Sequence, residues 1–530
     1  MIKTIDAATF FDVPPPCIPS DNQPPDFEGL VSRTLSLKPS KYPYSQVREI
    51  LEREHLRLGT ESTVLESVRS IDDETVYVIA GQQAGLFGGP LYTLYKAMHA
   101  IRLSSRLSET TGRKVIPLFW IASDDHDFDE VNSIGARTRD GSRTIVEYSP
   151  AQLLKNAPIG EIILDNGIDK ALDALAKYMT QGERAENYLD LLKSSWQPGR
   201  SWSDAFAVYM LKLFSQYGLV MIDPHWKGMK ELFKDIFIAE LSDPSASRSL
   251  ANEEAEKFET RKKRKKAIHK PEGSTNLFIT VKGIRTPLFA AKNGFKAGQM
   301  MFPGQEIFDM AASDPERLSP AALLRPVCQD AILPVAALIS GLGERLYLEQ
   351  VKPLYTHFGV DGSLLWPRAS FTIIDIRTQR NAYKEGIELP LLFEDMSRIH
   401  ADLTGKAFPA DVQSKLDSLA KSIETGFERL APHIGAIDTT LGNSLERDKT
   451  RMIHILKGIR AKALRAHKAS TTISEKRFAS ANYYLRPNGG PQERWFGADS
   501  ILTFLGEEGF DQLLKATSPG EECHRIVFLE

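Results

Sequence analysis

VYVIAGQQAGLFGGPLYTLYKAMHAI, residues 76–101, contains three local patterns whose order predicts a fold class. The first five residues are an apolar, β-rich run, and the next ten carry four glycines and end in a proline. Apolar side chains then recur with helical spacing, at Leu91, Leu94, Tyr95, Met98 and Ile101. A buried strand, a glycine-rich loop and a helix are therefore expected in this order.

Two further apolar runs are also followed by polar residues. Residues 115–122 (VIPLFWIA) lead directly into SDDHD, and residues 218–224 (GLVMIDP) reach an acid after an amphipathic helical pattern. Strands joined by helices of this length form βαβ units, which place the carboxyl ends of their strands at one edge of a parallel sheet. The sequence therefore predicts an α/β core with polar residues gathered at that edge.

The composition restricts the compartment and the partners. The net charge is −3, which provides no global field for gripping nucleic acid or an anionic membrane. No stretch approaches the roughly 18 apolar residues needed to span a bilayer, and the N-terminus has no apolar signal segment. The three cysteines, Cys17, Cys328 and Cys523, form no C-x-x-C pair, which excludes a disulfide framework. A cytoplasmic protein is expected, without a membrane or nucleic-acid partner.

A length of 530 residues predicts several structural units. A core is expected over residues 1–395, with insertions at about 137–200 and 240–315. Over residues 396–475 glycine and proline are sparse, and apolar residues recur at spacings of three and four, as is typical of an α-helical coiled coil. Residues 476–530 are expected to pack back on the core as a C-terminal segment.

The glycine-rich loop is a candidate anion site. Its backbone N–H groups lie beside a helix N-terminus, an arrangement that favours phosphate or carboxylate oxygens. The loop is neither a G-x-G-x-x-G fingerprint nor a phosphate loop with a lysine, and a glycine-rich turn needed only for packing is an equal alternative. Gln82 and Gln83 favour a site, because buried amides need a ligand or hydrogen-bond partners.

The segment from Asp124 to Glu130 places the imidazole of His126 among five carboxylates. It can bind Mg²⁺, raise the pKa of the imidazole for proton transfer, or form a solvated loop. Zinc is not expected, because such carboxylates favour hard cations and no second histidine or cysteine has ligand spacing. The position after an apolar strand favours a ligand site, because ligands bind at that end of open α/β sheets.

A third cluster is LRPVCQD, residues 324–330. Arg325 can hold a carboxylate or phosphate through two hydrogen bonds, and Gln329 or Asp330 can take an amine or a hydroxyl. Cys328 has no assignable base, so a nucleophilic role is not expected. The helix expected at 447–468 carries a row of basic residues that can meet nucleotide phosphates or RNA.

Four motifs, in order along nearly the whole chain, resemble the cysteine ligase family of bacillithiol biosynthesis, BshC. These motifs are GQQAGLFGGPLYTLYKA (81–97), PLFWIASDDHDFDEVN (117–132), LSPAALLRPVCQD (318–330) and YLRPNGGPQERWF (484–496). The resemblance implies a Rossmann-like core with connecting insertions and an α-helical coiled-coil arm that pairs two subunits as a homodimer. It also implies a reaction that adds cysteine to glucosaminyl malate.

The resemblance further implies roles for individual residues. The catalytic group is expected in the acidic segment, at Asp124, Asp125, His126 and Asp127. Substrates are expected to contact Gln82, Gln83, Tyr92, Lys96, Arg325, Gln329 and Asp330. Nucleotide phosphates are expected at Gly81, Gly85, Gly88 and Gly89, and a separate nucleotide pocket at Asn488, Gln492, Glu493 and Arg494.

The chemistry of this reaction suggests a mechanism. Joining the carboxyl group of cysteine to an amine is uphill in water, so activation is expected with ATP or ADP as the nucleotide, which Mg²⁺ can accompany. In this scheme the acidic segment holds Mg²⁺ or orients the amine, His126 or Asp127 takes its proton, and Arg325 holds the malyl carboxylates. The activated intermediate can be an adenylate or an acyl phosphate. The alternative is a protein without catalysis that binds a nucleotide or RNA and dimerises through the coiled coil.

Overall fold

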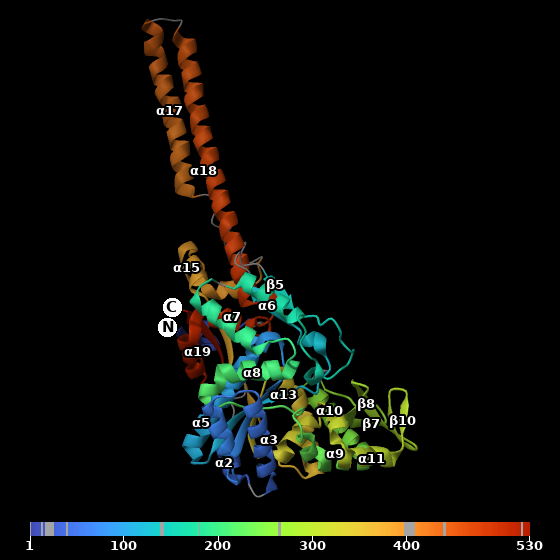
Figure 1. Ribbon diagram of the computed structural model, residues 1–530. Helices are drawn as coiled ribbons and strands as arrows, with labels where there is room; N and C mark the ends of the chain where they lie inside the picture. The colour runs from blue at the N-terminus through green and yellow to red at the C-terminus, as the bar shows by residue number, and fades with distance from the viewer. Residues whose placement is uncertain are drawn as a thin grey trace. The chain divides into compact units, whose positions relative to one another are not determined.

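The computed structural model describes residues 2–11, 14–15, 26–38, 41–137, 143–179, 181–262, 267–396, 409–437, 441–520 and 523–529 (Figure 1). The chain forms two compact units. The first contains Met1–Ile373 and Gly490–Glu530, and the second contains Ile374–Gly489. Among the described helices, none has an apolar stretch long enough to cross a membrane.

A five-stranded parallel sheet lies at the centre of the first unit. Its strands follow the order β13 (Leu364–Pro367), β12 (Val335–Ser340), β2 (Val76–Gln82), β3 (Val115–Ile121) and β6 (Val220–Ile222). β2 and β3 are almost entirely buried on both faces, which explains why each is a continuous apolar run rather than an alternating one. The helix α5 (Leu91–Thr111) connects these two strands and packs on both. The predicted α/β core is therefore confirmed.

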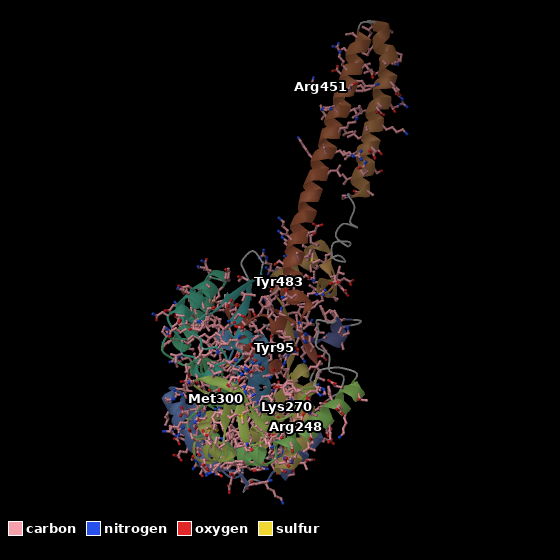
Figure 2. The ribbon with its side chains drawn as sticks, turned by 90° about the vertical axis from the view of Figure 1, so that its right-hand side faces the viewer. Tyr95, Arg248, Lys270, Met300, Arg451 and Tyr483 are labelled. Carbon is pink, nitrogen blue, oxygen red and sulfur yellow. The ribbon has the colours of Figure 1, made fainter. Side chains whose placement is uncertain are left out.

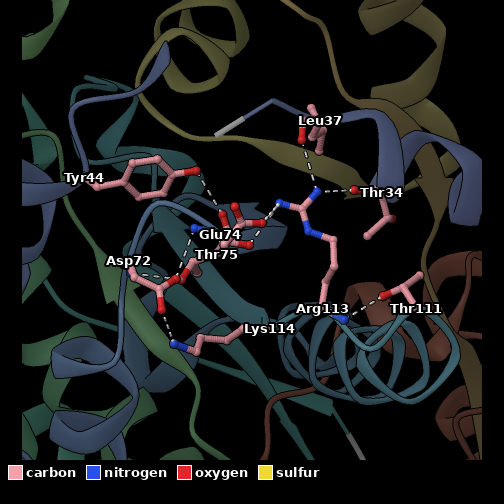
Figure 3. Close-up of polar contacts among 9 residues, drawn as sticks. All are labelled: Thr34, Leu37, Tyr44, Asp72, Glu74, Thr75, Thr111, Arg113 and Lys114. Atoms are coloured by element: carbon pink, nitrogen blue, oxygen red, sulfur yellow. Dashed lines mark hydrogen bonds and ion pairs between the residues drawn. The ribbon is translucent and has the colours of Figure 1, made fainter. Parts of the chain in front are cut away.

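Arg113, between α5 and β3, ties two N-terminal segments to the amino end of this sheet. Its Nη1 donates to the carbonyl oxygens of Thr34 and Leu37 at 2.6 and 3.1 Å, and its Nη2 donates to that of Glu74 at 3.0 Å (Figure 3). Thr34 belongs to α2 (Phe27–Ser36), and Glu74 precedes β2. One guanidinium thereby donates to three backbone carbonyl groups at the amino end of the sheet. The opposite edge, at the carboxyl ends of the strands, is formed by other elements.

A second sheet lies largely within the insertion predicted at about 240–315. Its order is β10 (Met300–Phe302), β9 (Gly294–Ala297), β8 (Ile284–Ala291), β7 (Ser274–Val281) and β11 (Leu318–Pro320), with antiparallel neighbours. The helices α9 (Lys234–Ser242) and α10 (Pro244–Lys262) pack against β7, and the group lies together in Figure 1. This sheet contributes Arg285 from β8 and Phe278 from β7 to the site described below.

The two ends of the chain meet in a third sheet. β1 (Ile2–Asp6) pairs antiparallel with β15 (His524–Leu529), and β15 neighbours β14 (Ser370–Ile374). Of the C-terminal segment expected over residues 476–530, Gly490–Glu530 belongs to the same compact unit as the parallel sheet, whereas residues 476–489 belong to the second unit.

The second unit is helical. α17 (Ala410–Ile437) and α18 (Gly442–Leu485) pack against each other as the long hairpin that the apolar spacing predicts (Figure 1). No residue of α17 is buried, and exposed side chains such as Arg451 project from α18 (Figure 2). The basic row of α18 meets acids of the same hairpin, because Arg460 lies 3.7 Å from Asp417 and Lys449 lies 2.6 Å from Glu446. These ion pairs offset the charge of Arg460 and Lys449 within the basic row.

Candidate active site

A cavity of about 490 Å³ opens at the carboxyl ends of β2, β3 and β12. The chain order reverses at β2, which β3 and β12 flank on opposite sides, and ligands of open α/β sheets bind in the crevice at such a point. The lining residues all belong to the first unit. Of the predicted site residues, the cavity brings together Gly81, Gln82, Gln83, Tyr92, Lys96, Asp124, Asp125, Arg325 and Arg494.

The two glutamines lie at the end of β2 and are held by protein partners. β2 pairs with β3 in register, so that Gln82 lies beside Ile121, three residues before the acidic segment begins at Asp124. Gln82 Nε2 donates to the hydroxyl of Tyr92 at 3.3 Å, and Gln83 Nε2 donates to Asp125 Oδ2 at 2.7 Å. These bonds give the half-buried amides protein partners at the rim of the cavity.

Lys96 is a buried cation with every N–H group in use. Its Nζ donates to Gly81 O at 2.7 Å, Gln82 Oε1 at 3.0 Å and Glu344 Oε2 at 2.6 Å. Burial lowers the pKa of Lys96, and the charge of Glu344 opposes this effect. Since an ammonium has three N–H groups, Lys96 positions the residues around it and has no donor left for a substrate.

Asp124 is buried at the edge of β3 but remains paired. Its Oδ1 lies 2.9 Å from Lys230 Nζ and 3.6 Å from His225 Nδ1. Burial alone raises the pKa of Asp124 and is the largest single effect, but the charges of Lys230, His225 and Arg285 together bring the pKa below its ordinary value. Asp124 therefore faces the cavity as a carboxylate at neutral pH.

His126 is held in one tautomer by Arg285. Arg285 Nη1 lies 3.1 Å from His126 Nδ1, and a guanidinium can only donate, so Nδ1 carries the lone pair and Nε2 carries the proton. Burial lowers the pKa of His126, and the charge of Arg285 lowers it further. His126 is thus a neutral ring whose basic nitrogen is occupied. Neither His126 nor the exposed Asp127 is among the described residues that line the cavity.

Arg285 reaches the cavity from the second sheet. Its Nε donates to Ser319 Oγ at 2.9 Å, its Nη2 donates to Pro320 O at 2.9 Å, and its guanidinium lies over the ring of Phe278 with Cζ 3.7 Å from the ring centroid. These contacts hold the buried guanidinium of Arg285 in one position.

Three arginines line the β12 side of the cavity: Arg325, Arg368 and Arg494. Arg325 Nη1 donates weakly, at 3.4 Å, to Gln329 Oε1. Gln329 and Asp330 are themselves fully buried and do not line the cavity; Gln329 Nε2 donates to Asp330 Oδ1 at 2.9 Å, and Asp330 Oδ2 accepts from Ser363 N at 2.7 Å. The structure therefore places Gln329 and Asp330 behind Arg325 as internal supports.

The tail motif divides between structural and cavity-lining positions. Gln492 bonds both backbone groups of Ile373, and Glu493 accepts from Arg368 and from Ser370 Oγ. Arg494 lines the cavity. Asn488 belongs to the second unit. Within the first unit, Arg494 brings the motif to the cavity at the parallel sheet.

The glycines of the loop serve packing. Gly81 lines the cavity, but Gly85, Gly88 and Gly89 do not. The N–H groups of Gly88 and Gly89 donate to carbonyl oxygens of the same loop, and that of Leu86 donates to Val131 O at 2.8 Å. A Cβ atom on Gly88 would lie 2.3 Å from Tyr209 Cε1. The structure thus supports the packing alternative for Gly88 and Gly89, whose N–H groups are already bonded, and for Gly85, where a Cβ atom would lie 2.6 Å from Gly89 Cα.

Metal binding has little support from these side chains. In the described ranges, no group of three histidine, cysteine or acidic side chains is placed to hold a metal ion. Asp124 Oδ1 is already paired with Lys230 at 2.9 Å, and Asp125 Oδ1 accepts from the backbone N–H of His126 at 2.7 Å.

Sequence reasoning gave no role to Glu344, Arg285, Arg368 and Lys230, which lie in or beside the cavity. Glu344 follows the apolar run of β12 and could be found as a polar residue after a strand, by the same rule as Asp124. Arg285, Arg368 and Lys230 are brought to the site only by long-range packing of other elements.

The architecture defines a class of protein: a Rossmann-like α/β unit with a charged cavity at the reversal point of its sheet, and a helical hairpin unit. Sequence models of one family cover the chain. The model described as Bacillithiol biosynthesis BshC, N-terminal Rossmann-like domain, matches residues 22–369, and that of the C-terminal coiled-coil domain matches residues 371–529. The chain belongs to the BshC family of bacillithiol biosynthesis.

Curated relatives agree over nearly the full length. A protein of Salinibacter ruber is 26% identical over 99% of this chain and 95% of its own length. Proteins of Heliobacterium modesticaldum and Chlorobium phaeobacteroides are each 28% identical over 94% of this chain, and over 93% and 90% of their own lengths. All three are named "Putative cysteine ligase BshC".

Proposed function

We propose that this protein is a ligase that joins the carboxyl group of cysteine to the amine of glucosaminyl malate. The observation that carries the proposal is the charge distribution of the cavity, with Asp124 and Asp125 following β3, and Arg325, Arg368 and Arg494 on the β12 side. Glucosaminyl malate has the complementary charges, an ammonium and two carboxylates. The names of the relatives supply the cysteine-joining reaction.

In the proposed reaction the amine attacks an activated cysteine carboxyl group. The C–N bond forms, and the activating group, an adenylate or a phosphate derived from ATP, leaves. Asp125 is the proton acceptor in this proposal, because it lines the cavity and is partly exposed, whereas His126 Nδ1 is occupied by Arg285. The arginines hold the malyl carboxylates, since guanidinium groups match carboxylates in geometry and charge.

The test is a ligation assay with purified protein. Cysteine, glucosaminyl malate and ATP are incubated with the protein, and the amide product is measured by mass spectrometry. Asp125→Asn is expected to lower turnover at least about a hundredfold, as for the loss of a general base, with the thermal midpoint unchanged. Asp129→Asn removes an exposed carboxylate of the same segment outside the cavity and is the matched control. No product from the wild-type protein with ATP would contradict the ligase proposal.

We also propose that the hairpin pairs two copies of the chain. Met452, Ile455 and Ile459 lie on α18 at spacings of three and four and are 45%, 56% and 50% exposed. A second hairpin would bury this apolar row, as in a coiled coil. Light scattering is expected to give a dimer for the wild type and a monomer for Ile455→Glu. Lys457→Glu, an exposed position on the same helix, is expected to remain dimeric.

A further inference from the structure

Lys230 approaches the cavity carboxylate Asp124 from the protein side. It begins the short helix η6 (Lys230–Phe233), its side chain is 3% exposed, and it is not among the described residues that line the cavity. Its Nζ lies 2.9 Å from Asp124 Oδ1 and donates to Glu316 O at 3.4 Å. Asp124 does line the cavity. The ion pair is therefore oriented, with its cation inside the protein and its anion toward the cavity.

The stability of the fold does not by itself explain the buried ion pair between Lys230 and Asp124. A buried ion pair contributes little net stability, because removing both charges from water costs about as much as their attraction returns. A hydrophobic pair of similar volume would fill the same space. Lys230 therefore has an effect that packing alone would not have, because it keeps the carboxylate of Asp124 negatively charged at the cavity wall.

We infer that Lys230 is a positioning residue that keeps Asp124 as a carboxylate aimed at the ammonium group of a substrate. This inference rests on the proposed function, in which the acidic side of the cavity receives the amine of glucosaminyl malate. Lys230 touches no substrate in this arrangement and acts through Asp124.

The surrounding charges support this role. Burial is the largest effect on the pKa of Asp124 and raises it, and the charge of Lys230 is the largest effect that lowers it. The other charged or titratable groups that interact with Asp124 include His225, Arg285, Asp223, Glu161, Glu316 and Cys328. Without Lys230, burial and the acids would favour the protonated form, which cannot hold an ammonium.

The first test measures binding rather than turnover. Calorimetric titration with glucosaminyl malate is run between pH 5 and 9, a range chosen to cover the titration of a perturbed carboxyl group. Lys230→Met is expected to weaken binding at least about tenfold at pH 7, and to bind better as the pH rises and Asp124 ionises. Lys230→Arg keeps the charge and is expected to restore binding. Lys234→Met, at an exposed neighbouring position, is the control. Wild-type affinity in Lys230→Met across the range would overturn the inference.

A second measurement separates this inference from the proposed function. The side-chain carboxyl carbons of aspartate are labelled with ¹³C, and the signal of Asp124 is assigned by its loss in Asp124→Asn. Its pKa is expected to rise in Lys230→Met and to stay low in Lys234→Met. If wild-type protein does not bind glucosaminyl malate, the proposed substrate is wrong, but this titration still decides the role of Lys230. An unchanged pKa in Lys230→Met would contradict it.

Discussion

Lys96 and Glu344 form an ion pair, 2.6 Å between Nζ and Oε2, that joins α5 to α13 (Leu342–Leu348) across the carboxyl edge of the sheet. The side chain of Lys96 is 3% exposed and that of Glu344 is 18% exposed. The same ammonium holds Gly81 and Gln82, the last residues of β2. Lys96 therefore links the carboxyl end of β2 to α13, the helix that follows β12, at the edge of the sheet where the cavity opens.

Lys96→Met is expected to destabilise the fold and to disorganise the cavity together. Removing one partner of a buried pair leaves the other charge without compensation, at a cost of about 3–5 kcal/mol, although the partial exposure of Glu344 reduces this value. Denaturant unfolding measures the free energy. The double variant with Glu344→Gln is expected to lose less than the sum of the single variants, because both remove the same interaction. Additive losses would show that the pair is not coupled.

Gly88→Ala tests the packing role of the glycine-rich loop. Gly88 has a φ of 95°, and an added Cβ would lie 2.3 Å from Tyr209 Cε1. Gly112→Ala is the control, because Gly112 has a φ of 68° with nothing within 4 Å of the added atom. The control is expected to cost about 1 kcal/mol of unfolding free energy from backbone strain alone. Gly88→Ala is expected to cost about 1–3 kcal/mol more, from overpacking. Equal costs would remove the packing argument.

The local patterns of the sequence were sufficient for three strands of the parallel sheet, β2, β3 and β6, and for part of the site. The apolar runs of β2 and β3 are continuous because both faces are covered, and parallel pairing then brings Gln82 next to the acidic segment. These two facts place Gln82, Asp124 and Asp125 at one edge without any knowledge of tertiary contacts.

The rest of the site depends on contacts that no local pattern contains. His126 stands in the acidic segment and looks like a base by residue type, but its Nδ1 faces Arg285, 159 positions away in the sequence. The pKa of Asp124 depends likewise on Lys230, at the start of η6. From the sequence, a glycine-rich loop beside a helix resembles an anion site. Only the structure shows that the N–H groups of Leu86, Gly88 and Gly89 already donate to carbonyl oxygens.

The tautomer of His126 gives a prediction that needs no substrate. Long-range ¹H–¹⁵N spectra of histidine-labelled protein are expected to show Nε2 protonated and Nδ1 unprotonated at neutral pH, because Nδ1 accepts from Arg285. Arg285→Met is expected to raise the pKa of His126 by removing a nearby cation, while burial continues to lower it. Lys292→Met, at an exposed position, is the control. A protonated Nδ1 in the wild type would contradict the assignment.

Glu240, a residue of α9 that faces β7, is expected to make stability depend on pH. Its side chain is buried and its Oε1 accepts from Asn276 N at 2.7 Å. Burial raises the pKa of Glu240 from 4.5 to about 7. The folded state therefore keeps a proton that the unfolded state releases, so this group lowers the free energy of unfolding as the pH rises from about 4.5 to about 7.

Glu240→Gln removes this titration while keeping an acceptor for Asn276. Relative to the wild type, the variant is expected to gain on the order of 3 kcal/mol of unfolding free energy between the ends of that pH range. The comparison between the two proteins cancels the opposite contributions of carboxylates with lowered pKa values, such as Asp124 and Glu493. Glu253→Gln, at an exposed position of α10, is expected to follow the wild type at every pH. Parallel curves for Glu240→Gln and wild type would mean that Glu240 titrates alike in the folded and unfolded chains, and that hydrogen bonds from Asn276 offset its burial completely.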